Sequence, residues 1–144
     1  MTTHDKSTEQ LLNEIKSTNE IQKFIDSNSE EFSSEPLHKL LCEMIKSSGL
    51  KKSDVVRRSG LNRVYTYQIL QGRRLPSRDK LVALCFGMQL TLDETNDLLK
   101  SAGLAELYAR SKRDSLIIYA INSKKNIFFV NELLFDNGFE ILTA

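Results

Sequence analysis

Residues 51–80 contain two short helical patterns joined by a turn of only three residues, and this arrangement constrains the fold more than any other part of the chain. The first pattern is KKSDVVRR, the second is NRVYTYQILQ, and Ser-Gly-Leu separates them. Gly60, at the centre of the turn, accepts the positive φ that a sharp bend requires. Helices joined in this way cross at a steep angle. The residues that we expect to be buried between them and a preceding helix are Val55, Val56, Leu61 and Ile69.

The same segment is strongly basic. Between Lys51 and Lys80 there are nine Lys or Arg residues and two acids, a net charge of +7, whereas the whole chain carries only +1. The flanking segments are acidic, with −4 over residues 1–50 and −2 over residues 81–144. Salt screens exposed charges beyond about 8–10 Å. A polyanion in contact with this segment is therefore attracted by its local charge of +7, although the net charge of the whole chain is close to zero. A basic pair of helices of this kind indicates a surface that lies on nucleic acid.

The chain before this segment also reads as helical. Ser7 and Gln10 have the spacing of a capping box at the start of a first short helix. A second short helix is expected to carry Ile21, Phe24 and Ile25, and the polar residues 26–35 resemble a linker. We therefore expect residues 1–32 to form a helical, partly mobile arm.

A helix-turn-helix bundle is expected over residues 36–103. Pro36 is placed for the first turn of its first helix, after a cap at Ser33 or Ser34. Thr91 and Glu94 form a capping box before the last helix of this unit. One apolar stripe of that first helix has the spacing i, i+3, i+4, i+7, i+8, and its members are Leu37, Leu40, Leu41, Met44 and Ile45.

The last part of the chain contains a repeat. Residues 81–107 align without a gap with residues 116–142, at an offset of 35, and each copy reads as helix, polar connection, helix and glycine. The identical pairs include Asn96/Asn131 and Gly103/Gly138. Such a period is typical of helical hairpins that bury their apolar faces against each other. We therefore expect residues 104–144 to form an extra C-terminal helical hairpin in an all-α fold.

Composition argues against several other functions. The only histidines are His4 and His38, so no Cys/His metal set has workable spacing, and Cys42 and Cys85 are expected to be buried, reduced thiols. Arg113 and Asp114 are expected to form a structural ion pair or cap rather than a catalytic site. No apolar run approaches the roughly 18 residues of a membrane span. We expect a cytoplasmic, non-enzymatic protein without metal or cofactor.

The second helix of the basic segment carries the candidate base-reading residues. If Asn62 caps this helix, its outward positions are Arg63, Val64, Tyr67 and Gln68. Arg can bond guanine twice, Gln can do the same for adenine, and Val can meet the thymine methyl group. The residues expected to hold phosphates are Lys51, Lys52, Asn62, Arg73, Arg74 and Arg78.

These residues resemble the lambda-repressor-like (XRE-type) helix-turn-helix family over about residues 36–99. The resemblance lies in PLHKLLCEMIKSSGL, KKSDVVRR, SGL, NRVYTYQILQG and RRLPSRDKLVALCFGMQLTLDETNDLL. It implies a lambda-repressor-like bundle and places the family's base-reading positions on Arg63, Val64 and Gln68. Its phosphate contacts fall on Lys52 and on the loop with Arg73 and Arg74.

Two functions follow as hypotheses. The first is a sequence-specific, double-stranded DNA-binding transcriptional regulator that acts as a homodimer. The second is a protein-binding adaptor or antitoxin-like partner that keeps the same fold. The aromatic residues of the last third have helical spacing and are expected mainly in the core, with a subunit or partner interface as the alternative, for which Phe128, Phe129 and Phe135 are candidates. The whole set is Tyr108, Tyr119, Phe128, Phe129, Phe135 and Phe139.

Overall fold

The computed structural model describes residues 7–17 and 36–144, and the chain divides into two units, Met1–Glu35 and Pro36–Ala144. In the first unit, α1 spans Thr8–Ser17. The predicted capping box is confirmed, since the Ser7 amide donates to Oε1 of Gln10 at 2.9 Å and the Gln10 amide donates to Oγ of Ser7 at 3.2 Å. The second helix and the linker predicted from the sequence lie outside the described residues, as do Ser33 and Ser34.

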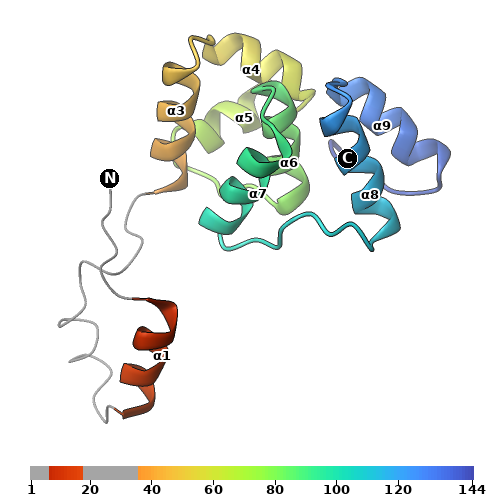
Figure 1. The fold of residues 1–144 in the computed structure, drawn as a ribbon. Helices are drawn as coiled ribbons and strands as arrows, with labels where there is room; N and C mark the ends of the chain where they lie inside the picture. The colour runs from red at the N-terminus through yellow and green to blue at the C-terminus, as the bar shows by residue number, and fades with distance from the viewer. Residues whose placement is uncertain (1–6, 18–35) are drawn as a thin grey trace. The chain divides into compact units, whose positions relative to one another are not determined.

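The second unit consists of helices, of which α7 and α8 are joined by an extended connection, and the described residues contain no strand (Figure 1). The all-α fold class is thus confirmed. The helix bounds are α3 Leu37–Ser47, α4 Lys52–Ser59, α5 Arg63–Leu70, α6 Arg78–Gly87, α7 Leu92–Ser101, α8 Lys112–Asn122 and α9 Ile127–Asp136. The predicted division between residues 103 and 104 stays a prediction from the sequence.

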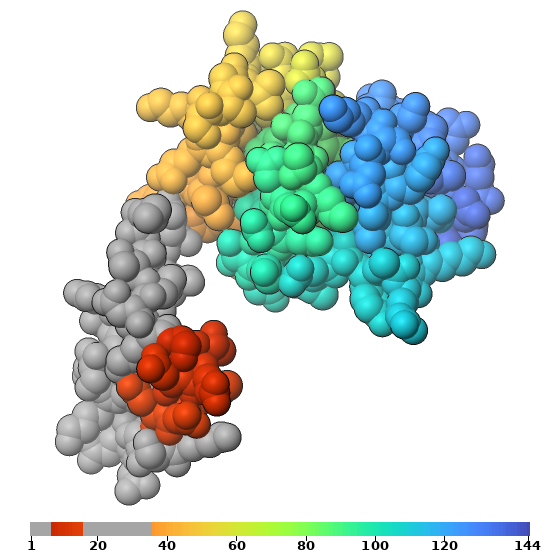
Figure 2. All heavy atoms as spheres, viewed as in Figure 1, coloured from red at the N-terminus to blue at the C-terminus, as the bar shows by residue number. Residues whose placement is uncertain are grey.

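Helix α6 is the centre of this unit. Every residue from Leu81 to Met88 is buried, because α4, α7 and α9 all pack against α6. Figure 2 shows the C-terminal helices lying directly against the middle of the chain. An amphipathic helix buries one stripe, whereas a helix enclosed on several sides is apolar all round. The run LVALCFGM is therefore explained by the position of α6.

Helices α3 to α5 form around the expected apolar positions. Leu41 and Ile45 are buried on α3, and the rest of its stripe is half-buried against the same core. Pro36 is the N-cap of α3, whereas it was expected within the first turn, after a cap at Ser33 or Ser34. Gly60 ends α4 with φ of 69°, in the left-handed conformation that the turn was expected to need. Among the residues predicted to be buried here, Val55, Val56 and Ile69 are buried and Leu61 is half-buried.

The close crossing of α4 and α6 depends on Gly87. A Cβ atom added there would lie 2.6 Å from the carbonyl oxygen of Val55 and 3.2 Å from the amide nitrogen of Ser59. Backbone atoms cannot rotate away as a side chain can, so Gly87→Ala must push the two helices apart. We expect a loss of about 1–3 kcal/mol of unfolding free energy, as for other overpacked cores, in urea denaturation.

Gly103→Ala is the matched control for this variant. A Cβ atom at Gly103 has nothing within 4 Å, so only the strain of its φ of 72° remains. If Gly87→Ala is no more destabilising than Gly103→Ala, α4 and α6 do not cross as closely as described.

The sequence repeat is also a structural repeat. Helices α7 and α9 begin and end 35 residues apart, and the connections before them contain Gln89 and Lys124, whose φ values are 57° and 56°. Asn96 Oδ1 accepts a hydrogen bond from the amide of Leu107 at 2.9 Å. Asn131 Oδ1 accepts the equivalent bond from Leu142 at the same distance. The pair α8–α9 thus repeats α6–α7, including irregular backbone that helical periodicity does not specify.

Reciprocal ion pairs join the two copies. Arg78 at the start of α6 pairs with Asp114 of α8 at 2.7 Å, and Arg113 of α8 pairs with Asp79 of α6 at 2.9 Å. These residues occupy equivalent positions, since 78 and 113, like 79 and 114, differ by 35. Reciprocal contacts of this kind indicate an approximate two-fold relation between the copies. Arg113 and Asp114 are therefore structural, as predicted, but each pairs across the interface rather than with its neighbour.

The prediction that the aromatic residues of this region belong to the core is wrong for four of them. Phe129 and Phe139 pack against the core. The exposed ones, with their exposed fractions, are Tyr108 (59%), Tyr119 (56%), Phe128 (64%) and Phe135 (73%). The core of α9 is instead formed by Ile127, Val130 and Leu134.

Candidate nucleic-acid interface

The start of α5 is fixed by its cap. Oδ1 of Asn62 accepts a hydrogen bond from the amide of Tyr65 at 3.0 Å, as predicted for an N-cap. Thr66 is fully buried, and its hydroxyl donates to the carbonyl oxygen of Asn62 at 2.6 Å. A threonine is therefore tolerated at this core position, because its only polar atom is satisfied within the helix.

Of the predicted base-reading residues, Arg63, Val64 and Gln68 lie away from the buried side of α5, whereas Tyr67 packs against the core. Thr66, Ile69 and Leu70 form the buried side. Arg63 and Val64 are exposed, with Val64 66% exposed, whereas Tyr67 and Gln68 are half-buried. Two further exposed residues were not singled out from the sequence. They are Gln71, which lies two turns from Val64 on the same side, and Leu75, 84% exposed in the following loop.

The arginines on this surface lie over aromatic rings. The guanidinium of Arg63 lies 5.8 Å from the ring centre of Tyr67, and that of Arg74 lies 5.9 Å from the ring centre of Tyr65. Such cation–π contacts contribute about 0.5–1 kcal/mol at exposed sites. The tyrosines therefore limit the positions of the two cations without neutralising them.

Arg74 also determines what Gln68 can recognise. Its Nε donates to Oε1 of Gln68 at 2.7 Å. With that oxygen engaged, the Gln68 side chain presents mainly its NH₂ donors. Bidentate recognition of adenine needs both the oxygen and the nitrogen, so Arg74 would have to release Gln68 first.

Exposed basic residues precede and follow α5 along the chain. Lys51 and Lys52 lie at the start of α4, and Arg73 and Arg74 lie in the loop after α5; all four are exposed. Within the described residues, none of them has an ion pair to a carboxylate. Their charge is therefore available to a partner.

The hydrogen bonds of Arg78 argue against its predicted role as a phosphate contact. Its guanidinium donates to both oxygens of Asp114, at 3.0 and 2.7 Å, and to the carbonyl oxygens of Ala105 and Glu106, both at 2.9 Å. These bonds join the start of α6 to α8 and to the loop before it. The sequence shows the positive charge of Arg78 but not its partner 36 residues away.

The environment of Asp114 favours the charged carboxylate. Burial acts to raise the pKa of Asp114, but hydrogen bonds from Arg78 and from the amide of Tyr108 oppose it. The positive charges of Arg78 and Arg113 act in the same direction, and the net result is a pKa below the ordinary value. This ion pair is therefore intact near neutral pH.

The cysteines give no sign of a reactive site. Both are free thiols, and Cys42 donates a hydrogen bond to the carbonyl oxygen of Leu70 at 3.4 Å. Burial raises the pKa of Cys85 to about 12, which keeps it protonated. Over residues 7–17 and 36–144, no three His, Cys, Asp or Glu side chains are grouped as metal ligands. No helix among these residues is long and apolar enough to cross a membrane.

Comparison with known proteins identifies the bundle. Residues 40–98 match the family model described as a helix-turn-helix domain. No curated protein and no solved structure matches the chain. The matched residues begin in α3, include the α4–turn–α5 unit and end in α7. Domains of this kind typically bind DNA through the second helix of the motif, which here is α5. Residues 40–98 of this chain therefore form a helix-turn-helix domain.

Proposed function

We propose that this protein is a sequence-specific transcriptional regulator of the lambda-repressor-like (XRE-type) family, which reads the major groove of double-stranded DNA with α5. One observation carries the proposal: the outward side of α5 exposes Arg63 and Val64, and exposed cations precede and follow this helix along the chain. These cations are Lys51 and Lys52 at the start of α4, and Arg73 and Arg74 after α5. The major groove is about 12 Å wide and admits one helix, so cations on both flanks suit the phosphates on its two sides.

The proposed contacts divide into two kinds. Arg63, Val64, Tyr67 and Gln68 read base edges, and a bidentate Arg–guanine contact is worth about 1–3 kcal/mol of discrimination. The phosphate contacts fix the register of the protein on the duplex and add affinity without sequence information. These are assigned to Lys51, Lys52, Asn62, Arg73 and Arg74.

We also propose that the protein acts as a homodimer. Helix-turn-helix dimers bind half-sites about one helical turn, roughly 34 Å, apart. The exposed aromatic side chains of the C-terminal hairpin, Tyr119, Phe128 and Phe135, supply a candidate surface for the second copy.

Selection from a pool of random duplex DNA, at a stated salt concentration, tests this function. We expect enrichment of a short motif that contains guanine, repeated with two-fold symmetry at about one helical turn. Recovery of a single motif without symmetry would argue against the dimer, and recovery of no motif would argue against sequence-specific binding.

The same exposed aromatic residues favour a second candidate, a protein-binding adaptor or antitoxin-like partner. They lie within residues 81–144, whose net charge is −2 and which thus suit DNA less well than residues 51–80 do. Recovery of a stoichiometric protein partner, together with no selected DNA, would favour this second function over the first.

A further inference from the structure

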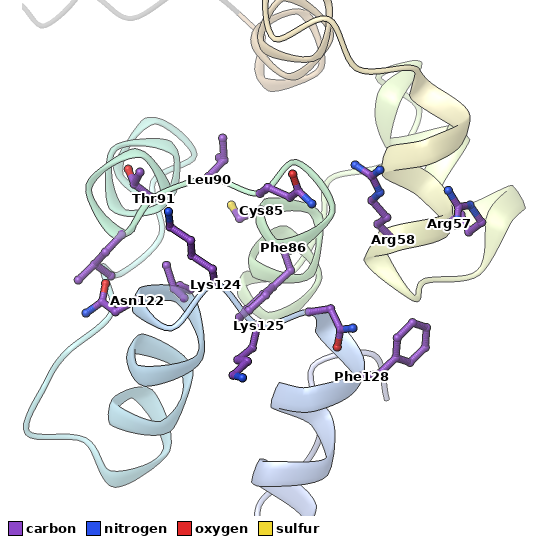
Figure 3. A pocket seen from close by; sticks show the side chains of 14 residues that line it. Arg57, Arg58, Cys85, Phe86, Leu90, Thr91, Asn122, Lys124, Lys125 and Phe128 are labelled. Carbon is purple, nitrogen blue, oxygen red and sulfur yellow. The ribbon is translucent and has the colours of Figure 1, made fainter.

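A cavity of about 960 Å³ lies beside the turn of the helix-turn-helix motif (Figure 3). Its walls come from α4, from the ends of α6 and α8, and from the starts of α7 and α9. Sites for small molecules typically have volumes of about 300–1,000 Å³, so this cavity is large enough for one. It is separate from the outward residues of α5, none of which lines it.

The cavity combines an apolar floor with a basic rim. Phe86 and Ile121 are buried residues of the floor. Arg57 and Arg58 of α4 stand on one side, and Lys124 and Lys125 stand on the other (Figure 3). Among the residues that the structure describes, no Asp or Glu lines the cavity. A cleft with charges of one sign and low-dielectric walls concentrates its potential, which here attracts anions.

The cations of the rim have little counter-charge of their own. Arg57 pairs with Asp54, but the two side chains are 72% and 37% exposed, and such surface pairs contribute little. Nζ of Lys125 lies 5.3 Å from the ring centre of Phe129, and this contact does not neutralise the charge of Lys125. Within the described residues, neither Arg58 nor Lys124 has an ion pair to a carboxylate. A bound anion would supply the missing charge.

The internal repeat shows that the connection before α9 does not need the two lysines. The first copy makes the same connection with Gln89 and Leu90 where the second has Lys124 and Lys125. The first turn of α7 contains Asp93 and Glu94, whereas that of α9 contains no acid and has aromatic residues at the equivalent positions. The second copy therefore has cationic and aromatic groups at the cavity where its structural equivalent has neutral and acidic ones.

The cavity also adjoins a contact between the motif and the C-terminal hairpin. A Cβ atom on Gly60 would lie 3.3 Å from Cγ2 of Ile127, so the turn of the motif packs against the first residue of α9. Arg58 lies two residues before Gly60, and Phe128 follows Ile127; both line the cavity. A ligand that contacts both Arg58 and Phe128 would therefore change the position of α4 and α5 relative to α9.

We propose that this cavity binds a small amphipathic anion, whose carboxylate or phosphate group meets Arg58, Lys124 and Lys125 while its apolar body covers Phe86 and Ile121. Binding of this ligand alters DNA affinity through the contact of Gly60 with Ile127. The second statement rests on the proposed DNA-binding function, whereas the first does not.

The binding step is tested on the full chain with the fluorescent probe anilinonaphthalene sulfonate. Its uncharged analogue, phenylnaphthylamine, has the same aromatic body and lacks the anion. We expect the variant Lys124→Gln with Lys125→Gln to bind the sulfonate at least tenfold more weakly and the neutral analogue unchanged. Glutamine already occupies the position equivalent to Lys124 in the first copy, at Gln89, with the same backbone conformation. The matched control is Lys39→Gln with Lys112→Gln, two exposed lysines that do not line the cavity.

Competition experiments identify the head group. Octanoate and octyl phosphate are expected to displace the probe, the better-fitting head group at the lower concentration, and octanol is expected not to do so. Equal displacement by octanol, or equal loss of probe binding in the control variant, would overturn the anion site.

The DNA assay separates this site from the proposed function. If Lys124→Gln with Lys125→Gln weakens DNA binding as much as loss of Arg63 does, these cations belong to the DNA surface and the ligand site is wrong. If the wild-type chain binds the probe as expected but no DNA, the site stands and the DNA-binding function fails. A probe that binds without changing DNA affinity would overturn the coupling alone.

Discussion

Reversing the charge of two arginines, Arg63→Glu with Arg74→Glu, is expected to lower the affinity for the selected duplex by at least about 100-fold. Arg63 is the proposed guanine contact, worth about 1–3 kcal/mol, and Arg74 is a proposed phosphate contact. Glutamate at either position would also repel the DNA backbone. The measurement is fluorescence anisotropy of the labelled duplex at a fixed salt concentration, because such affinities depend steeply on salt.

The control for this experiment reverses two charges elsewhere, with Lys39→Glu and Lys112→Glu. Both lysines are exposed, and neither lies on α5 or its flanks. The change in net charge is therefore the same, and only its location differs. If the Arg63 and Arg74 variant stays within threefold of the wild type, or if the control loses as much affinity, α5 is not the reading helix.

Removing the carboxylate of Asp114 is expected to cost about 3 kcal/mol of unfolding free energy. The Asp114 side chain is only 9% exposed, and it accepts bonds from Arg78 and from the amide of Tyr108. Removing one partner of a buried pair usually costs about 3–5 kcal/mol. The lower end of this energy range applies to Asp114→Asn, because Arg78 is 24% exposed and keeps its bonds to two carbonyl oxygens. Urea denaturation of Asp114→Asn measures the loss.

The reciprocal pair provides the matched comparison. Asp79 is 33% exposed, so Asp79→Asn removes a better-solvated charge from Arg113 and is expected to cost about 1 kcal/mol. Equal losses in the two variants would contradict the asymmetric burial of the two pairs.

The effect of Asp114 also depends on pH in a defined direction. Because the folded state lowers the pKa of Asp114, its contribution is complete above the unfolded-state pKa of about 4 and is lost as the pH falls through the lower folded value. The difference in stability between the wild type and Asp114→Asn should therefore shrink below about pH 4. A difference that grows on acidification would mean that the sign of the pKa change is wrong.

Features set by near neighbours were the easiest to predict from the sequence. The Thr91/Glu94 capping box joins residues three apart, and the left-handed Gly60 terminates its own helix. Asn62 likewise bonds within its own first turn. Each of these interactions depends on local spacing that the sequence displays, so the helix bounds around the motif follow closely.

Features set by distant partners were predicted less well. Charge alone placed Arg78 with the phosphate contacts, although its partner lies in the other copy of the repeat. Helical spacing tells which aromatic residues share a face but not whether another element covers that face. Among the described helices, none buries the side chains of Phe128 and Phe135.

The basic rim of the cavity is another feature that depends on partners far apart in the sequence. Counted along the chain, Lys124 and Lys125 belong to a segment with a net negative charge, and Arg57 and Arg58 belong to the basic segment. Only the packing of α9 beside α4 and α6 brings the four cations to one rim. The sequence does contain one signal for this rim, since the alignment of the repeat pairs Lys124 with Gln89 and Lys125 with Leu90.

The most direct test of the DNA-binding surface is the salt dependence of wild-type affinity for duplex DNA. Four proposed phosphate contacts come from cations, namely Lys51, Lys52, Arg73 and Arg74. Each is expected to contribute a slope of about −0.9 in a plot of log affinity against log salt concentration, so the total is about −3.6 for each protomer. A slope near that value is the predicted result, and an affinity that does not change with salt would contradict the account.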